Sequence, residues 1–246
     1  MQKIVKYSFY FGIFICLFAI ILILATNAYL KPSLPKIKLV DEAELQMPLK
    51  VYTKDGILIG EFGEIKRRSI TFTEIPENIK NAFLAAEDDN FFNHQGISYT
   101  GLIRSFIRCL RPSGCEGGGG TITMQVVRGY LLTREQTVIR KIKEIFLALE
   151  LEGNLEKEEI FELYVNRIFL GNRSYGIEAA ANTYFDKNIK ELSISESATI
   201  AALAQLPSRV NPVKDPRRTK LRRNWILSRM FLLGYIDEIQ YKEAVS

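Results

Sequence analysis

The sequence is poor in the residues that bind transition metals, with one histidine and three cysteines among 246 residues. Cys16 lies within a long apolar run, and Cys109 and Cys115 do not have the spacing of zinc ligands. A Cys/His metal site is therefore disfavoured. Two states of Cys109 and Cys115 remain open: a disulfide in an oxidising compartment, or a small core residue and a loop thiol.

The sequence also lacks two features of proteins that bind nucleotides or nucleic acids. The net charge is only +5, which does not indicate a nucleic-acid partner and suits an anionic lipid surface or an anionic substrate equally well. The glycine run Gly117–Gly120 is not followed by Gly-Lys-Ser/Thr, so it is not a nucleotide-binding P-loop. It is either a plain flexible loop or a loop whose amides hold an anionic or sugar ligand with side chains of the next turns: Thr121, Thr123, Gln125 and Arg128.

Charged residues are absent from Tyr7 to Leu30. Within this stretch Phe9–Ala25 is almost wholly apolar, and a helix needs about 20 such residues to cross a bilayer. A cleavable signal peptide would have a shorter apolar region, of about 7 to 15 residues, and an end of A-x-A type. We therefore predict that residues 1–30 form a short cytoplasmic tail and an uncleaved transmembrane anchor.

Residues 31–75 are predicted to form a stalk and a small β element. The segment Lys31–Pro48 is interrupted by prolines and carries charges of both signs. After it, Asp55-Gly56 is a turn signal between two apolar runs, which predicts a β-hairpin with Arg68–Phe72 as a candidate third strand. This element is too small to be a domain core.

Helical periodicity dominates residues 76–246, which we predict to be one mainly α-helical domain. Pro76 is placed to open the first helix, and Ser193 and Glu196 form a capping box that opens a later one. Gly234 is expected to end the last of the predicted helices. After the first helix, the predicted ranges are Thr137–Leu151, Lys157–Leu170, Ser193–Leu206 and Pro216–Leu233.

The decapeptide Glu87–Gly96 reads EDDNFFNHQG and directly follows an apolar stripe at helical spacing that ends at Ala86. Where a core borders a cleft, partial desolvation would make Glu87 a better proton acceptor near neutral pH. The alternative is that Glu87 and Asp88 are solvated residues at a helix end. His94 is interpreted as a hydrogen-bonded structural residue rather than a proton shuttle.

The helix predicted at 137–151 carries three cations within four residues, Arg140, Lys141 and Lys143. Such a cluster suits a diphosphate, whereas the alternative is a solvated basic face that an Arg140–Glu144 pair partly neutralises. The apolar side of this helix is expected to hold four residues: Ile142, Ile145, Phe146 and Leu149.

Glu162 belongs to the polar side of the next predicted helix, with Glu159 and Asn166. By itself this position indicates only a surface glutamate.

Five ordered blocks of the sequence resemble the family 51 glycosyltransferases, which are the peptidoglycan polymerase module of class A penicillin-binding proteins and of monofunctional transglycosylases. The resemblance runs from about Leu49 to the end of the chain. The blocks are Glu87-Asp88 with Phe91 and His94-Gln-Gly96; Gly119–Gln125; Arg140–Glu144; Ile160–Asn166 with Gly171 and Tyr175–Ala180; and Glu196 to Asn211-Pro212.

The resemblance implies a lysozyme-like, mainly helical fold that polymerises lipid II into β-1,4-linked glycan strands by an inverting single displacement. It implies that Glu87 is the general base and that Glu162 assists departure of undecaprenyl diphosphate through a divalent metal, Mg²⁺ or Mn²⁺. Residues expected to bind the substrate are Asp88, Phe91, His94, Thr121, Thr123, Gln125, Arg128, Arg140, Lys141, Lys143 and Asn166.

The same resemblance implies the surroundings of the enzyme. Its partners would be lipid II, the growing lipid-linked strand, the cytoplasmic membrane and other cell-wall synthesis proteins, with the catalytic domain on the outer, periplasmic face of the bacterial inner membrane. The chain contains no Lys-Thr-Gly motif, so we expect no transpeptidase domain and no penicillin binding in it.

The sequence departs from the family pattern at several positions. Gly120 and Met124 replace the serine and first glutamine of Ser-Thr-Ile-Thr-Gln-Gln, and Gln136 stands where many members have arginine. Two alternative functions therefore stay open: a catalytically weak scaffold anchored in the membrane, and a lysozyme-like glycan hydrolase in which Glu87 donates a proton.

Overall fold

The structure is a computed structural model. It describes residues 49–55, 58–62, 70–101, 120–132 and 137–246, together with the single positions Tyr10, Phe14, Pro32, Leu34, Pro35, Ile103 and Ile107. No helix in this part of the chain combines the length and the apolar character needed to cross a bilayer. Apart from the single positions, the predicted anchor and stalk lie outside the described residues, as do all three cysteines and Gln136.

Two short strands, β1 (Leu49–Tyr52) and β2 (Leu58–Phe62), occupy the region where the sequence predicts a hairpin. They pair antiparallel, with Leu49 opposite Phe62, and the register shifts between Val51 and Tyr52. The candidate third strand is wrong where it is described: Ile70 is not in a strand, and Phe72–Glu74 forms the 3₁₀ turn η3.

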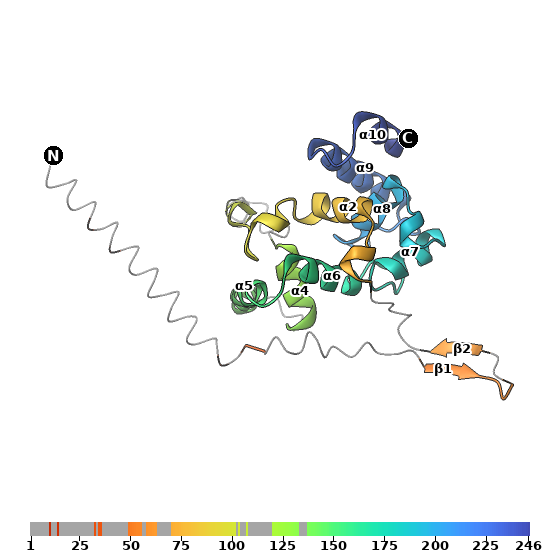
Figure 1. Ribbon diagram of the computed structural model, residues 1–246, viewed down its shortest axis with the longest axis horizontal. Helices are drawn as coiled ribbons and strands as arrows, with labels where there is room; N and C mark the ends of the chain where they lie inside the picture. Colours follow the sequence, from red (N-terminus) through yellow and green to blue (C-terminus); the bar gives the residue numbers. More distant parts are fainter. Residues whose placement is uncertain are drawn as a thin grey trace.

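One group of helices packs around α2 (Glu77–Glu87), which contacts α8 (Ile194–Leu203) and α9 (Pro216–Leu232). The final helix, α10 (Glu238–Val245), packs on α8 and α9. Figure 1 shows these helices side by side at one end of the helical part. We call them the α2/α8/α9 group.

The second group is built on α4 (Ile122–Tyr130), which contacts both α5 (Val138–Glu152) and α6 (Lys157–Arg167). We call it the α4/α5/α6 group. The helix α7 (Ile177–Phe185) contacts α6 on one side and α8 on the other, so it connects the two groups (Figure 1). Three-residue 3₁₀ turns, η4 (Phe91–Asn93) and η5 (Ile189–Glu191), follow α2 and α7.

The helix ends are where the sequence prediction is most accurate. Pro76 is the N-cap of α2, and the reciprocal capping box of Ser193 and Glu196 opens α8. Gly234, just after α9, has a φ of 75°, which only glycine adopts without strain. The predicted mainly helical class is confirmed, although α8 ends three residues earlier than expected, at Leu203.

A single hydrophobic core runs through both groups of helices. Its fully buried side chains include Phe83 of α2, Phe161 of α6, Leu203 of α8 and Met230 of α9. Phe161 also makes an edge contact with Phe72 of η3, at 5.9 Å between ring centroids. The two groups are therefore parts of one packed unit.

The buried side of α5 differs from the predicted one. Leu147, Ala148 and Leu151 are fully buried, and so is Glu144, whereas Leu149 is 40% exposed. Three further residues of the expected apolar side are only partly buried: Ile142, Ile145 and Phe146. The helix is apolar on more than one side, so periodicity alone selected the wrong one.

Candidate functional site

Glu87 is the last residue of α2, and the C-terminal end of a helix carries partial negative charge. Its side chain is partly buried, and its Oε2 accepts a hydrogen bond from Nε2 of Gln125 on α4 at 2.8 Å. Burial raises the pKa of the Glu87 carboxyl above its ordinary value. The solvated-helix-end interpretation is therefore wrong for Glu87.

The charges around Glu87 act in both directions on its pKa. The hydrogen bond from Gln125 and the positive charges of Arg222 and Arg128 lower it, while the negative charge of Asp88 adds to the rise caused by burial. Tyr164 of α6 belongs to the same environment, because burial and then the charge of Glu87 raise the pKa of its hydroxyl well above the usual range. Residues of α4, α6 and α9 thus interact electrostatically with one carboxyl at the end of α2.

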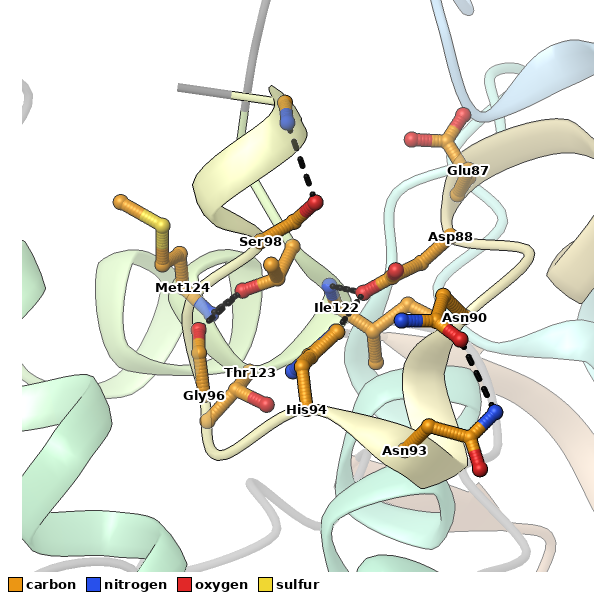
Figure 2. A network of polar contacts seen from close by, with 12 residues as sticks. Glu87, Asp88, Asn90, Asn93, His94, Gly96, Ser98, Ile122, Thr123 and Met124 are labelled. Atoms are coloured by element: carbon orange, nitrogen blue, oxygen red, sulfur yellow. Dashed lines mark hydrogen bonds and ion pairs between the residues drawn. The ribbon is translucent and has the colours of Figure 1, made fainter. Parts of the chain in front are cut away.

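Asp88 has a different role from its neighbour, as Figure 2 shows. It is buried, and its Oδ2 accepts hydrogen bonds from the backbone N–H of Ile122 at 3.1 Å and from Nε2 of His94 at 2.9 Å. The Asp88 carboxylate therefore binds the N-terminus of α4 to the end of α2. The carboxylate of Glu87 points away from this network (Figure 2).

Two further predicted substrate contacts, Thr121 and Thr123, make interior hydrogen bonds. Thr121 is the N-cap of α4: its Oγ1 accepts from the N–H of Met124 and donates to the carbonyl of Gly96 at 2.6 Å. Thr123 is fully buried and donates to Oε1 of Glu152 at 2.5 Å. The hydroxyls of both threonines are thus engaged by other groups of the protein. The structure therefore does not favour the first turn of α4 as an anion site.

Phe91 and His94 also face inward. Phe91 is 1% exposed and packs its ring at 6.1 Å from that of His94. His94 bonds to Asp88, in agreement with its interpretation as a structural histidine. Both residues have little surface for a substrate, and their contact with one stays a prediction.

Glu162 and Asn166 hold the segment that precedes α2. The Asn166 side chain accepts from the N–H of Ile70 at 2.9 Å and donates to its carbonyl at 2.8 Å. Glu162 Oε2 accepts from the N–H of Phe72 at 3.0 Å. The Asn166 amide is thus occupied by the backbone, whereas Glu162 is partly exposed and has a second carboxylate oxygen.

The basic cluster of α5 is organised by a buried acid. Glu144 is fully buried; its Oε1 lies 3.1 Å from Nζ of Lys141, and its Oε2 lies 3.8 Å from Nη1 of Arg140. A buried carboxylate requires such partners. A Cβ built on Gly120 would lie 3.8 Å from both Lys141 Nζ and Glu144 Oε1, so the end of the glycine run meets this cluster. Glu144 therefore holds Arg140, as predicted, and also Lys141.

Within the described part of the chain, the fit of a divalent metal depends on Glu162. Among the described residues no group of three or more His, Cys, Asp or Glu side chains could hold a metal ion. Mg²⁺ is commonly bound by one or two carboxylates together with phosphate oxygens and water. Glu162 therefore fits a metal ion that arrives with a diphosphate, and not one held by protein ligands alone.

Two residues of the Glu87 environment were missed by the sequence analysis. Tyr164 stands among apolar residues in the sequence of α6, and Arg222 is one of several cations in the sequence of α9. Arg222 Nη2 lies 3.4 Å from the carbonyl oxygen of Ala86, a contact that spans 136 positions in the chain. No local pattern contains that information.

Comparison with known proteins gives a consistent result. Residues 55–231 match the sequence profile of the family described as Transglycosylase. The chain is 53% identical over 217 residues to penicillin-binding protein 1A of Pseudomonas aeruginosa, covering 88% of this chain and 26% of that protein. It is 39% identical over 243 residues to penicillin-binding protein 1A of Escherichia coli, covering 99% of this chain and 29% of that protein.

A solved structure is similar as well. The crystal structure of penicillin-binding protein 1A from Haemophilus influenzae aligns with a TM-score of 0.50 and 34% identity, over 82% of this chain and 21% of that chain. The chain thus spans less than a third of the length of each of these three relatives.

Proposed function

Because the chain belongs to the transglycosylase family, we propose that it is a peptidoglycan glycosyltransferase that polymerises lipid II into β-1,4-linked glycan strands. The observation that carries this proposal is the state of Glu87. A carboxyl whose pKa is raised by burial, and which Gln125 holds by a hydrogen bond, is suited to accept a proton near neutral pH.

In the proposed reaction, Glu87 removes the proton from the 4-hydroxyl of the acceptor's N-acetylglucosamine. That oxygen attacks C1 of the muramyl donor from the face opposite the leaving group. The bond between C1 and the diphosphate oxygen breaks, and its electron pair leaves with undecaprenyl diphosphate. One displacement of this kind inverts the configuration at C1, which gives the β linkage.

The leaving diphosphate needs positive charge opposite it. Arg128 is exposed on α4, and the α5 cluster supplies Arg140, Lys141 and Lys143. Buried Glu144 cancels one of these charges and fixes Arg140 and Lys141 in place. We propose that these cations stabilise the charge that develops on the diphosphate.

Glu162 is proposed as the second carboxylate of the reaction. It would hold a Mg²⁺ or Mn²⁺ ion against the diphosphate, where the ion supplies additional charge neutralisation. The Phe72 N–H donates a hydrogen bond to this carboxylate and holds the side chain against the segment before α2. Glutamine keeps an oxygen that can accept this bond but loses the charge that would bind the metal. Glu162→Gln should therefore weaken metal-dependent activity more than it weakens the fold.

A substrate with a lipid anchor also requires an enzyme at the membrane. We propose that residues 1–30 anchor the chain in the bacterial cytoplasmic membrane, with the helical domain on the outer face, where lipid II and the growing strand would be reached. Association with other cell-wall synthesis proteins belongs to the same proposal.

The test is polymerisation of lipid II in the presence of Mg²⁺, with glycan strands separated on a gel. Glu87→Gln should lower the rate by about 10²- to 10⁴-fold, the typical contribution of a well-placed base. Glu77→Gln, at the other end of α2 where the exposed Glu77 pairs with Lys80, should leave the rate within about twofold, because ion pairs of exposed carboxylates contribute little.

Three results would overturn the proposal. Full activity of Glu87→Gln would show that Glu87 is not the base. Cleavage of preformed glycan without synthesis would identify a hydrolase. Binding of lipid II without turnover by the folded wild-type chain would identify a scaffold.

A further inference from the structure

Arg222 lies on α9, which packs against α2. Its Nη2 reaches the carbonyl oxygen of Ala86, the residue before Glu87, at 3.4 Å. Its guanidinium also stacks on the ring of Trp225 from the same helix, at 4.1 Å from the ring centroid. Two contacts therefore fix a cation at the C-terminal end of α2, where backbone carbonyls carry partial negative charge.

Arg222 differs from a typical surface arginine in its burial. The side chain is partly buried, and its Nε, which is fully buried, makes no hydrogen bond to the described residues. Burial lowers the pKa of Arg222, and the charge of Glu87 acts in the opposite direction. The cation is thus held in a place that costs free energy, and the negative charge of Glu87 offsets part of the cost.

Groups from several elements contribute to the electrostatic environment of Glu87. Asp88 is the neighbouring anion, Gln125 and Arg128 come from α4, Tyr164 from α6 and Arg222 from α9. Of the two cations, Arg128 is exposed and Arg222 is partly buried. Salt screens an exposed charge more strongly than a buried one, so Arg222 is the cation whose effect persists at physiological ionic strength.

We propose that Arg222 is a positioning residue for Glu87: fixed by the Ala86 carbonyl and the Trp225 ring at the end of α2, its guanidinium supplies a positive charge that balances the negative charge of the Glu87 carboxylate. This inference rests on the proposed role of Glu87 as the base. It assigns to α9, a helix outside the glycine run and the α5 cluster, an influence on the reaction that acts through Glu87.

The experiment compares Arg222→Gln with Arg223→Gln. Arg223 is the next residue on α9, but its guanidinium bonds to Ser195, Asn224 and the carbonyl of Val245. Two quantities are measured for each variant: the pH dependence of kcat/KM on lipid II, and the titration of the Glu87 carboxyl by ¹³C NMR of the free protein, assigned with Glu87→Gln.

Loss of the Arg222 charge should raise the pKa of Glu87, so the acid limb of kcat/KM should move to higher pH. Because a nearby opposite charge changes a carboxyl pKa substantially, we expect kcat/KM on the acidic side to fall about tenfold more than on the alkaline plateau. Arg222→Lys, which retains the charge, should restore most of the acidic activity. Arg223→Gln should leave both the limb and the titration in place.

An unchanged Glu87 titration in Arg222→Gln, or an equal change in Arg223→Gln, overturns the inference. If Arg222→Gln does not fold, Trp225→Leu removes the ring that holds the guanidinium, and the absence of any upward change in its Glu87 titration overturns the inference equally. The titration needs no lipid II. A shifted titration in a chain that makes no polymer would therefore reject the proposed function and leave the coupling between Arg222 and Glu87 intact.

Discussion

At Glu87 the requirements of folding and of the proposed chemistry oppose each other. A base must be ready to take up a proton near neutral pH, and burial achieves this by making the charged form costly. The same cost reduces the stability of the folded chain at any pH where Glu87 is ionised. Such conflicts between stability and activity are common at sites that perform chemistry.

Glu87→Gln should therefore be more stable than the wild type at pH 7.5. The folded-state pKa of Glu87 lies above its unfolded value, so the folded state binds the proton more tightly and wild-type stability falls as pH rises between these two values. Glutamine cannot ionise and can still bond to Gln125. The gain should be present above the folded pKa and should shrink as pH falls below it.

Urea unfolding from pH 4 to pH 8 measures this gain. Glu77→Gln is the matched control, since Glu77 is an exposed glutamate of the same helix. A Glu87→Gln chain less stable than the wild type at pH 7.5, with a difference that does not depend on pH, would show that the carboxylate stabilises the fold.

Only some residues of the proposed site could be predicted from the sequence alone. Glu87 was found because a polar residue directly follows an apolar helical stripe, which is a local pattern. Arg222 was not found, because its proximity to Ala86 depends on how α9 packs against α2. Interior roles such as that of Asp88 were likewise hidden, since the partner amide of Ile122 lies 34 residues away.

At the scale of single elements, helix ends could be predicted and buried faces could not always be. Caps at Pro76 and Ser193 are local chemistry, and the structure places them as expected. On α5 both candidate faces carry apolar residues. The buried face is the one with Glu144, whose carboxylate is paired with Arg140 and Lys141. The Arg140–Glu144 pair could be predicted from its spacing, but the burial of Glu144 depends on how α5 packs in the domain, which the periodicity does not contain.

Leu147 and Leu149 of α5 test this reassigned face directly. Leu147 is fully buried, so Leu147→Ala should lower the free energy of unfolding by about 2 to 5 kcal/mol. Leu149 is 40% exposed, and Leu149→Ala should lower it by less than about 1 kcal/mol. Denaturant unfolding of the two variants measures both free energies. Equal losses of stability would contradict the assignment of Leu147 to the buried face and Leu149 to the exposed one.

At the scale of the whole molecule, the proposed site lies at the junction of the α2/α8/α9 and α4/α5/α6 groups. Glu87 comes from the first group and its hydrogen-bond donor Gln125 from the second. The distance between them depends on how the groups are joined. Next to the site, the join includes the bond from the N–H of Ile122 to the carboxylate of Asp88, which also binds His94 (Figure 2).

This architecture predicts that Asp88 acts as a clamp between the two groups. Asp88→Ala would leave the Ile122 N–H and the His94 ring without their partner in a buried place, and should lower the free energy of unfolding by about 2 to 4 kcal/mol. Polymerisation should fall with it, because Gln125 would no longer be held against Glu87.

Asp89→Ala is the matched control, since Asp89 is exposed and pairs with Arg229 at the surface. Its loss should cost less than about 1 kcal/mol, as is usual for exposed ion pairs. If Asp88→Ala were no more destabilising than Asp89→Ala but still abolished polymerisation, Asp88 would act on the substrate and not between the helix groups. A large loss of stability in Asp88→Ala alone would show that the position of the proposed base depends on a bond between the two halves of the domain.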